Sequence, residues 1–228
     1  MAQGIGRIME LHLESGGLGG WIDCPPGMRP QPGQYLLASS PDVSEPLPHV
    51  LFPAEVMEGR LRIAAPLPPA WTVGTKLGLR GPLGRGFTLP AATRRLAMAC
   101  LDDSPARLLP LAAQALRQNA AVALYARTVV AHLPEEVEVL PLDLLPEAPA
   151  WADFLALDIS IATLPVLREQ LGLRPHQLLG CHTQVLVRTA MPCSGLGDCG
   201  VCAVRTRDGW RLACSDGPVF DFLQLEEG

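Results

Sequence analysis

The first 87 residues contain several short runs in which apolar and polar side chains alternate. Such runs lie at 8–14, 61–64 and 76–80, and a more apolar run at 34–38 follows Pro32-Gly33. Glycine and proline residues separate these runs, as they do where a chain turns between strands. The pattern predicts several short strands that form a small antiparallel β-barrel.

From about residue 93 the pattern changes. The continuous apolar run at 95–101 is typical of a strand that is buried on both faces of a parallel sheet. Leucine and alanine recur at helical spacing over 106–119, and 164–171 has the same character, so both stretches are predicted helices. Further strands are predicted at 121–126, 137–140 and 154–158. Alternating strands and helices indicate an α/β domain.

These patterns divide the 228 residues into three expected parts. We expect an N-terminal β-barrel at 1–90 and a reduced α/β domain at 91–174. A C-terminal segment at 175–228 completes the chain, which is long enough for two modest domains and a small appendage.

Four of the seven cysteines lie close together in the C-terminal segment. They are Cys193, Cys199, Cys202 and Cys214. Glycines at 195, 197 and 200 allow the positive φ angles and the close backbone approach that a buried inorganic cluster requires. Four converging thiolates with backbone N–H groups nearby are typical of a [2Fe–2S] cluster, and we predict these four cysteines as its ligands.

The four cysteines are also compatible with sites that hold no iron. Cys199 and Cys202 would suit one arm of a structural zinc site, although the second C-x-x-C pair of a zinc ribbon is missing. Five residues separate Cys193 from Cys199, one more than in the plant-type cluster motif, and a bulge within 194–198 is expected to absorb the extra residue. Disulfides and unligated buried thiols are the remaining alternatives.

Composition argues against some classes of partner and indicates a cellular compartment. The net charge is −5 with no basic block, which argues against nucleic acid as a partner. The most apolar stretch, 150–167, is interrupted by Asp153 and Asp158, so no membrane span is predicted. The N-terminus lacks the pattern of an export signal, and three isolated thiols fit a reducing cytoplasm. Those thiols are Cys24, Cys100 and Cys181.

Three short motifs carry a resemblance to a known family. Pro32-Gly33-Gln34-Tyr35 is similar to a PGQF motif, 81–87 (GPLGRGF) to a GPLGxGF motif, and 214–220 (CSDGPVF) to a CxDGPVF motif. Together with the order of the three parts, they resemble the electron-transfer subunit of class 1B dihydroorotate dehydrogenase, an enzyme of pyrimidine biosynthesis. That family lies within the ferredoxin-reductase-like flavoproteins. The resemblance implies a flavin-containing catalytic subunit as partner, and hence a hetero-oligomer.

The motifs that bind FAD in that family are replaced in this chain. An Arg-Pro-x-Ser segment, whose arginine neutralises the diphosphate, corresponds here to 46–52 (PLPHVLF), and a Gly-Thr segment corresponds to 65–69 (APLPP). We therefore predict a barrel without flavin that serves as scaffold and docking surface. The alternative is that FAD is retained through backbone amides near Val50 and Leu51 or by stacking on Tyr35.

The pyridine-nucleotide motifs are replaced as well. The family's glycine-rich loop corresponds here to 99–105 (ACLDDSP), and its CGPxxM segment to 157–162 (LDISIA). Asp102 and Asp103 would repel a diphosphate, and we expect them to cap the following helix themselves. No NAD(P)H site is predicted.

The sequence thus predicts an iron–sulfur subunit that relays electrons to or from a flavin-containing catalytic partner and completes no reaction alone. Two alternatives remain: an FAD-containing oxidoreductase subunit that uses NAD(P)H, and a zinc-stapled assembly protein without redox function. His49 and the Cys181-His182 pair are interpreted as structural residues.

Overall fold

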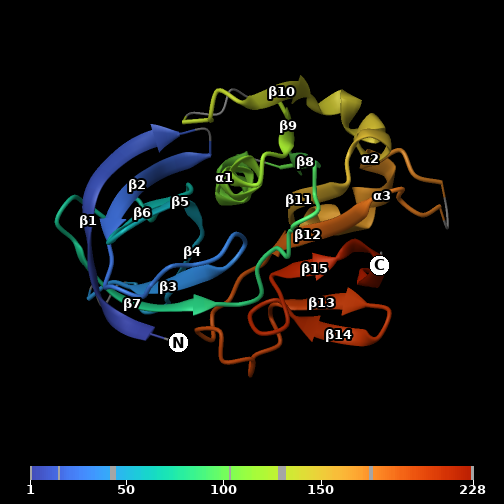
Figure 1. The fold of residues 1–228 in the computed structure, drawn as a ribbon. Coiled ribbons are helices and arrows are strands. Elements are labelled where there is room, and N and C mark those ends of the chain that lie inside the picture. Colours follow the sequence, from blue (N-terminus) through green and yellow to red (C-terminus); the bar gives the residue numbers. More distant parts are fainter. Residues whose placement is uncertain are drawn as a thin grey trace.

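The computed structural model describes residues 2–14, 16–41, 45–102, 104–127, 132–174 and 177–226. Three sheets account for its strands: one of seven strands, one of six and one of two. Figure 1 shows the seven-stranded sheet on one side of the molecule and the six-stranded sheet on the other, with helix α1 (Leu109–Arg117) between them.

The predicted antiparallel barrel is confirmed. Its strands follow the order β4-β3-β7-β1-β2-β6-β5. Their bounds are β1 (Ala2–Glu14), β2 (Gly17–Asp23), β3 (Tyr35–Ser39), β4 (His49–Leu51), β5 (Pro53–Met57), β6 (Arg60–Ile63) and β7 (Lys76–Leu83). The alternating runs direct every second side chain inward, where residues such as Ile8, Ile22 and Leu61 form a fully buried core.

The second sheet has the order β10-β9-β8-β11-β12-β15. Its strands are β8 (Arg95–Cys100), β9 (Ala121–Ala126), β10 (Val137–Pro141), β11 (Phe154–Ser160), β12 (His182–Arg188) and β15 (Val219–Asp221). All neighbours pair in parallel except β12 and β15. Chain order runs outward from β8 in one direction and from β11 in the other, so the topological switch point lies between these two strands.

The predicted helices are shorter than the sequence pattern indicated. The stretch predicted at 106–119 is a 3-10 turn, η1 (Pro105–Leu108), followed by α1. The stretch predicted at 164–171 is η3 (Ile161–Val166) followed by α3 (Leu167–Gln170). Pro110 and Pro165, which lie within these two stretches, lack the N–H that a continuous helix interior needs. The remaining helical turns are η2 (Leu142–Glu147), α2 (Ala148–Trp151) and η4 (Phe222–Gln224).

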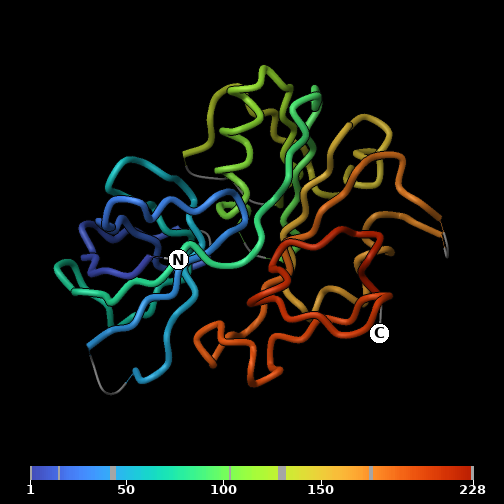
Figure 2. The backbone as a smooth tube through the Cα atoms, turned by 60° about the horizontal axis from the view of Figure 1, so that its bottom comes forward, coloured from blue at the N-terminus to red at the C-terminus, as the bar shows by residue number. Residues whose placement is uncertain are grey.

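The part of the C-terminal segment after β12 lies in the lower part of Figure 1, in orange to red, and comes forward in Figure 2. Its hairpin consists of β13 (Ala203–Thr206) and β14 (Gly209–Leu212). The same predicted segment also contributes β12 and β15 to the six-stranded sheet. The division at residue 174 stays a prediction, but the last part is joined to the α/β sheet by strand pairing.

The three motifs that carry the family resemblance meet at one junction. Gly84 has φ +74°, and a Cβ there would lie 2.6 Å from Pro218 Cδ and 2.9 Å from Tyr35 Cε1. A Cβ on Gly33 would lie 2.6 Å from Val219 Cγ2. Only glycine allows such close approach, so these glycines let barrel, linker and C-terminal segment pack together.

No helix in the described parts of the chain is long and apolar enough to cross a membrane.

Candidate metal centre

A left-handed backbone shapes the loop that carries the first three cysteines. Ser194, Gly195, Gly197 and Gly200 all have φ between +57° and +82°. The N–H of Leu196 donates to the carbonyl of Cys193 at 3.2 Å, which closes a tight turn. This conformation curls the chain around Cys193, and it is the reason for the glycines that the sequence places here.

Cys193 and Cys199 form one pair of thiols. The Cys199 side chain and the N–H groups of Cys199, Gly197 and Leu196 are directed at the Cys193 sulfur, and together they lower the pKa of that thiol to about 6. A thiol whose anion is stabilised in this way is present as thiolate at neutral pH, the form that binds metal. Cys199 is exposed and Cys193 is half-buried, so this pair faces the surface.

Cys202 and Cys214 form a second pair, which faces the interior. Both side chains are buried, with 1% and 3% exposure. Burial and the neighbouring Cys202 side chain raise the pKa of the Cys214 thiol to about 12. Ala213 N–H donates to the Cys202 carbonyl at 2.9 Å, which holds the two cysteine-bearing segments side by side. A thiol in such surroundings loses its proton when a metal compensates the charge.

The described residues contain no group of three or more His, Cys, Asp or Glu side chains arranged around one metal ion. What they contain is two thiol pairs within one segment. The two pairs lie near enough to interact: the charge of Cys193 also raises the pKa of the Cys214 thiol. Four thiols in two pairs, with backbone N–H donors beside one sulfur, fit the donor set of a two-iron cluster.

Tyr35 connects the barrel to this centre. Its side chain is fully buried, and its hydroxyl donates a hydrogen bond to the carbonyl oxygen of Cys214 at 3.0 Å. Burial, followed by the nearby Cys214 thiol, raises the pKa of Tyr35, which keeps the hydroxyl protonated as a donor. The sequence interpretation of Tyr35 as a stacking partner for flavin is wrong, because the ring has no exposed face. The sequence signal for the hydrogen bond between Tyr35 and Cys214 is a tyrosine at the position where the PGQF motif has phenylalanine.

Residues 189–226 match the family model of the iron-sulfur cluster binding domain of dihydroorotate dehydrogenase B. This segment is similar to an iron–sulfur cluster binding domain. The matched range includes all four cysteines, so the cluster-binding domain comprises the curled loop, the β13–β14 hairpin and β15. A comparison with curated proteins gives no match.

Solved structures support the ferredoxin-reductase-like fold of the whole chain. The NADH-dependent reduced ferredoxin-NADP oxidoreductase aligns over 98% of this chain and 90% of that chain, with a TM-score of 0.77 and 18% identity. A ferredoxin NADP+ reductase from Neisseria gonorrhoeae with bound FAD and NADP aligns over 82% and 99%, with a TM-score of 0.58 and 12% identity. At these identities the similarity establishes the fold.

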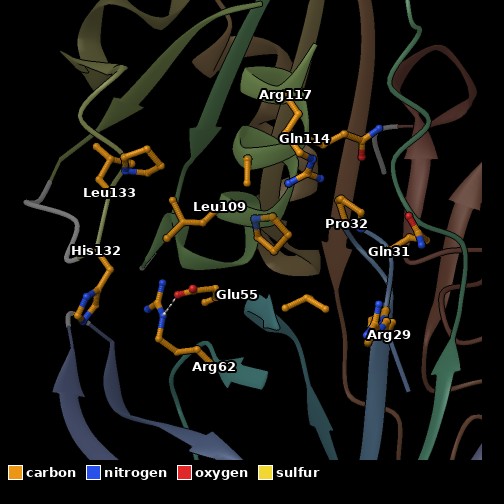
Figure 3. Close-up of a pocket in the computed structure, with 16 residues that line it drawn as sticks. Arg29, Gln31, Pro32, Glu55, Arg62, Leu109, Gln114, Arg117, His132 and Leu133 are labelled. Atoms are coloured by element: carbon orange, nitrogen blue, oxygen red, sulfur yellow. Dashed lines mark ion pairs between the residues drawn. The ribbon is translucent and has the colours of Figure 1, made fainter. Parts of the chain in front are cut away.

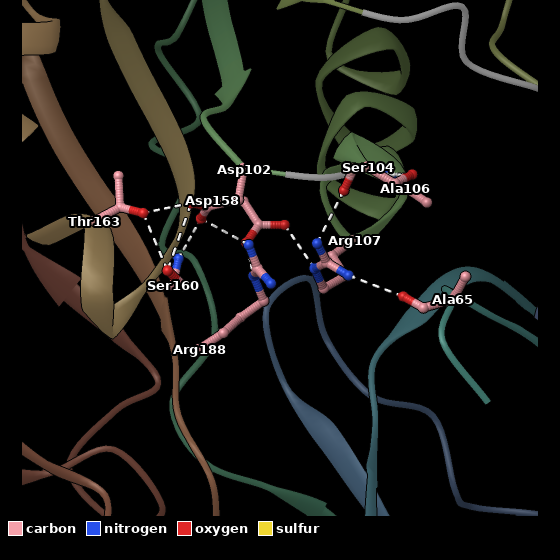
Figure 4. Close-up of polar contacts among 9 residues, drawn as sticks. All are labelled: Ala65, Asp102, Ser104, Ala106, Arg107, Asp158, Ser160, Thr163 and Arg188. Carbon is pink, nitrogen blue, oxygen red and sulfur yellow. Dashed lines mark hydrogen bonds and ion pairs between the residues drawn. The ribbon is translucent and has the colours of Figure 1, made fainter. Parts of the chain in front are cut away.

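The switch point of the α/β sheet is filled by ion pairs (Figure 4). Asp158 on β11 is fully buried and accepts from Arg107 Nε at 2.7 Å and from Arg188 Nε at 2.7 Å. Arg188 also donates to Asp102 at 2.8 Å. Arg107 Nη1 donates to the carbonyl of Ala65 in the barrel at 3.1 Å, so the network joins the two larger parts of the molecule.

The prediction that Asp102 caps the following helix is wrong. The residue that caps η1 is Ser104, whose hydroxyl accepts from Ala106 N–H at 3.3 Å, and not Asp102. Asp102 instead accepts from Ser160 N–H, from the Thr163 hydroxyl and from Arg188. The full positive charge of an arginine stabilises a carboxylate more strongly than the partial positive charge of a helix N-terminus, so Asp102 pairs with Arg188. Asp103 lies outside the described residues.

The switch point does not fit a dinucleotide. Two carboxylates, Asp102 and Asp158, balance two guanidinium groups, Arg107 and Arg188, so these four groups leave no net positive charge for a diphosphate. The nearby helical turn η1 is four residues long and its cap is satisfied by Ser104. These features replace the glycine-rich phosphate loop of dinucleotide-binding domains.

The two barrel segments that replace the family's FAD motifs are engaged with protein groups. The His49 ring lies edge-on to Trp71 at 5.1 Å between centroids. Val50 and Phe52 pack against the central core, the buried cluster that includes Tyr35, Tyr125 and Leu157. The Ala65 carbonyl is held by Arg107, whose charge Asp158 already neutralises. The arginine that reaches this segment therefore offers no free charge for a flavin diphosphate.

The remaining cysteines and His182 lie apart from the cluster-binding loop. Cys24 and Cys100 are buried and Cys181 is half-buried, and none of the three forms a disulfide. Burial raises the pKa of Cys24 and of Cys181, which lowers their reactivity. The His182 ring packs edge-on against Phe154 and lies 3.3 Å from Asp221.

A cavity of about 670 Å³ lies between α1 and the β5–β6 hairpin (Figure 3). Arg62 at its floor is 2% exposed and pairs with Glu14 at 3.0 Å and Glu55 at 3.5 Å. Arg29 at its rim pairs with Glu58 at 3.1 Å. Carboxylates therefore compensate these two arginines, and none of the described residues of the cluster-binding domain lines the cavity.

Proposed function

We propose that this chain relays single electrons through a [2Fe–2S] cluster to or from a flavin-containing dihydroorotate dehydrogenase catalytic subunit. The proposed ligands are Cys193, Cys199, Cys202 and Cys214. One observation carries the proposal: the range that matches the cluster-binding family model is the range in which the four thiols lie in two close pairs. A bound cluster supplies reversible one-electron transfer.

The two thiol pairs have distinct roles in this proposal. Cys202 and Cys214 would hold the iron nearer the core, where burial excludes water from the thiolates. Cys193 and Cys199 would hold the iron nearer the surface, where the N–H groups of Leu196 and Gly197 stabilise sulfur charge. One side of the cluster would thus be anchored and the other accessible to a partner.

Exposed apolar side chains on the cluster-binding domain favour docking of a protein partner at this side. Leu196 is 63% exposed, Val201 54% and Trp210 69%. Leu196 and Val201 lie in the cysteine loop itself, on either side of Cys199. Large apolar residues are costly to expose on a monomer, and an aromatic residue such as Trp210 is typical of an interface centre.

The experiment that tests the proposal is co-expression of this chain with a dihydroorotate dehydrogenase catalytic subunit, followed by purification through a tag on this chain. We expect a brown complex in which reduction of the flavin subunit by dihydroorotate bleaches the cluster. A colourless chain that contains zinc would support the zinc-stapled assembly protein instead. A brown chain that neither binds the catalytic subunit nor is reduced through it would refute this partner.

NADH and NADPH are not expected to bind, because the balanced ion pairs at the switch point leave no positive charge for the diphosphate. Titration calorimetry with the purified chain, and with its complex, measures this directly. A dissociation constant of about 1 μM, which corresponds to about −8 kcal/mol, would contradict the prediction and favour the oxidoreductase that uses NAD(P)H.

FAD is expected to be absent from the barrel or bound far below one per chain. Loss of a charge-assisted arginine–diphosphate contact weakens binding by about ten- to a hundredfold. The measurement is flavin released by acid from this chain purified apart from any flavin-containing partner. One FAD per chain would overturn the prediction and make the chain a converter between two-electron flavin chemistry and one-electron cluster chemistry.

A further inference from the structure

One barrel side chain reaches the backbone of a proposed cluster ligand. Tyr35 begins β3, and its hydroxyl donates to the carbonyl of Cys214 at 3.0 Å across 179 positions in the sequence. The tyrosine is fully buried, and its ring lies 5.8 Å from that of Phe52. A buried hydroxyl with a single defined acceptor holds that acceptor in place.

The same hydroxyl lies against the cysteine loop. A Cβ on Gly195 would be 3.1 Å from Tyr35 Oη, so a larger residue at 195 would press on the hydroxyl. A Cβ on Gly84 would likewise lie 2.9 Å from Tyr35 Cε1. Two glycines in left-handed conformation therefore leave room for this one side chain between the barrel and both ligand-bearing segments.

We propose that Tyr35 is a positioning residue for the cluster, and that its hydroxyl raises the cluster's reduction potential. This inference rests on the proposed function, since it assumes that Cys214 is a ligand. The donated hydrogen bond withdraws charge from the Cys214 peptide and orients the positive end of the O–H dipole toward the ligand. Reduction adds a negative charge to the cluster, so a donor close to a ligand stabilises the reduced state.

The test compares two tyrosine-to-phenylalanine variants. Tyr35→Phe removes only the hydroxyl, and the resulting residue is the one found in the PGQF motif. Tyr125→Phe is the matched control, because Tyr125 is also buried in the central core but donates no hydrogen bond to any described residue. Both variants are purified with the cluster and compared with the unmodified chain.

Three measurements separate a positioning role from a purely structural one. For Tyr35→Phe we expect a more negative midpoint potential in a redox titration and an altered EPR spectrum of the reduced cluster. We also expect bleaching by an iron chelator to proceed about fivefold faster, the factor that corresponds to the loss of one hydrogen bond. Tyr125→Phe should leave all three values unchanged, and far-UV circular dichroism should show that both variants are folded.

The outcomes distinguish this inference from the proposed function. If the unmodified chain holds no iron and sulfide, the proposed function fails. If the unmodified chain holds the cluster but Tyr35→Phe leaves the potential and the EPR spectrum unchanged, the positioning role is refuted while the proposed function stands. Equal shifts in both variants would also refute it, because they would reflect a general loosening of the core.

Discussion

Replacing Cys202 with serine is expected to abolish the visible absorption of the purified chain and remove most of its iron. The unmodified chain should hold about two irons and two acid-labile sulfides. Cys202 is 1% exposed and pairs with Cys214, so its replacement leaves one sulfur in the buried thiol pair. Iron, sulfide and absorbance measurements on anaerobically purified protein check this result.

The control for Cys202→Ser is Cys181→Ser. Cys181 is a free, half-buried thiol just before β12, outside the range that matches the cluster-binding family model. This variant should keep the full iron and sulfide content. Loss of iron from Cys181→Ser, or retention of an unaltered spectrum by Cys202→Ser, would show that the ligand assignment is wrong.

The second large effect is expected from Asp158→Asn. Asp158 is fully buried and serves both Arg107 and Arg188, so a neutral side chain leaves two guanidinium groups without their shared counter-charge. Removing one partner of a buried ion pair destabilises a protein by about 3–5 kcal/mol. Urea unfolding of the cluster-loaded chain, followed by circular dichroism, measures the free energy of unfolding.

A surface ion pair provides the comparison. Glu226 pairs with Arg205 at 2.8 Å, where the arginine side chain is 56% exposed, and Glu226→Gln should change the unfolding free energy by less than about 1 kcal/mol. A similarly small effect of Asp158→Asn would mean that the switch-point network contributes little to stability. It would also argue against a stabilising role for the contact between Arg107 and the Ala65 carbonyl, which joins the barrel to the α/β sheet.

The ion-pair network accounts for the difference between this chain and dinucleotide-binding members of its fold class. In those proteins the carboxyl ends of the central strands bind a ligand at the switch point. Here the same edge is closed by the chain's own charges, two positive and two negative. The range that matches the cluster-binding family model begins at residue 189, directly after Arg188 of this network.

Local sequence patterns were sufficient to predict much of the architecture. Alternation over 8–14 and 76–80 predicted barrel strands, because a strand that lines a core must turn every second side chain inward. The apolar run at 95–101 predicted a central parallel strand, since helices or other layers cover both faces. The spacing of the four cysteines with intervening glycines predicted the cluster-binding segment, because a ligand loop is encoded by residues adjacent in sequence.

The sequence by itself thus determined the barrel, the parallel strands and the segment that binds the cluster. Only the tertiary structure decided that Asp102 pairs with Arg188 instead of capping a helix, and that Tyr35 donates to Cys214 instead of facing a flavin. These pairings join residues 86 and 179 positions apart. Local propensity does not specify such contacts, because the partner of a buried polar group is set by which distant strands the fold brings together.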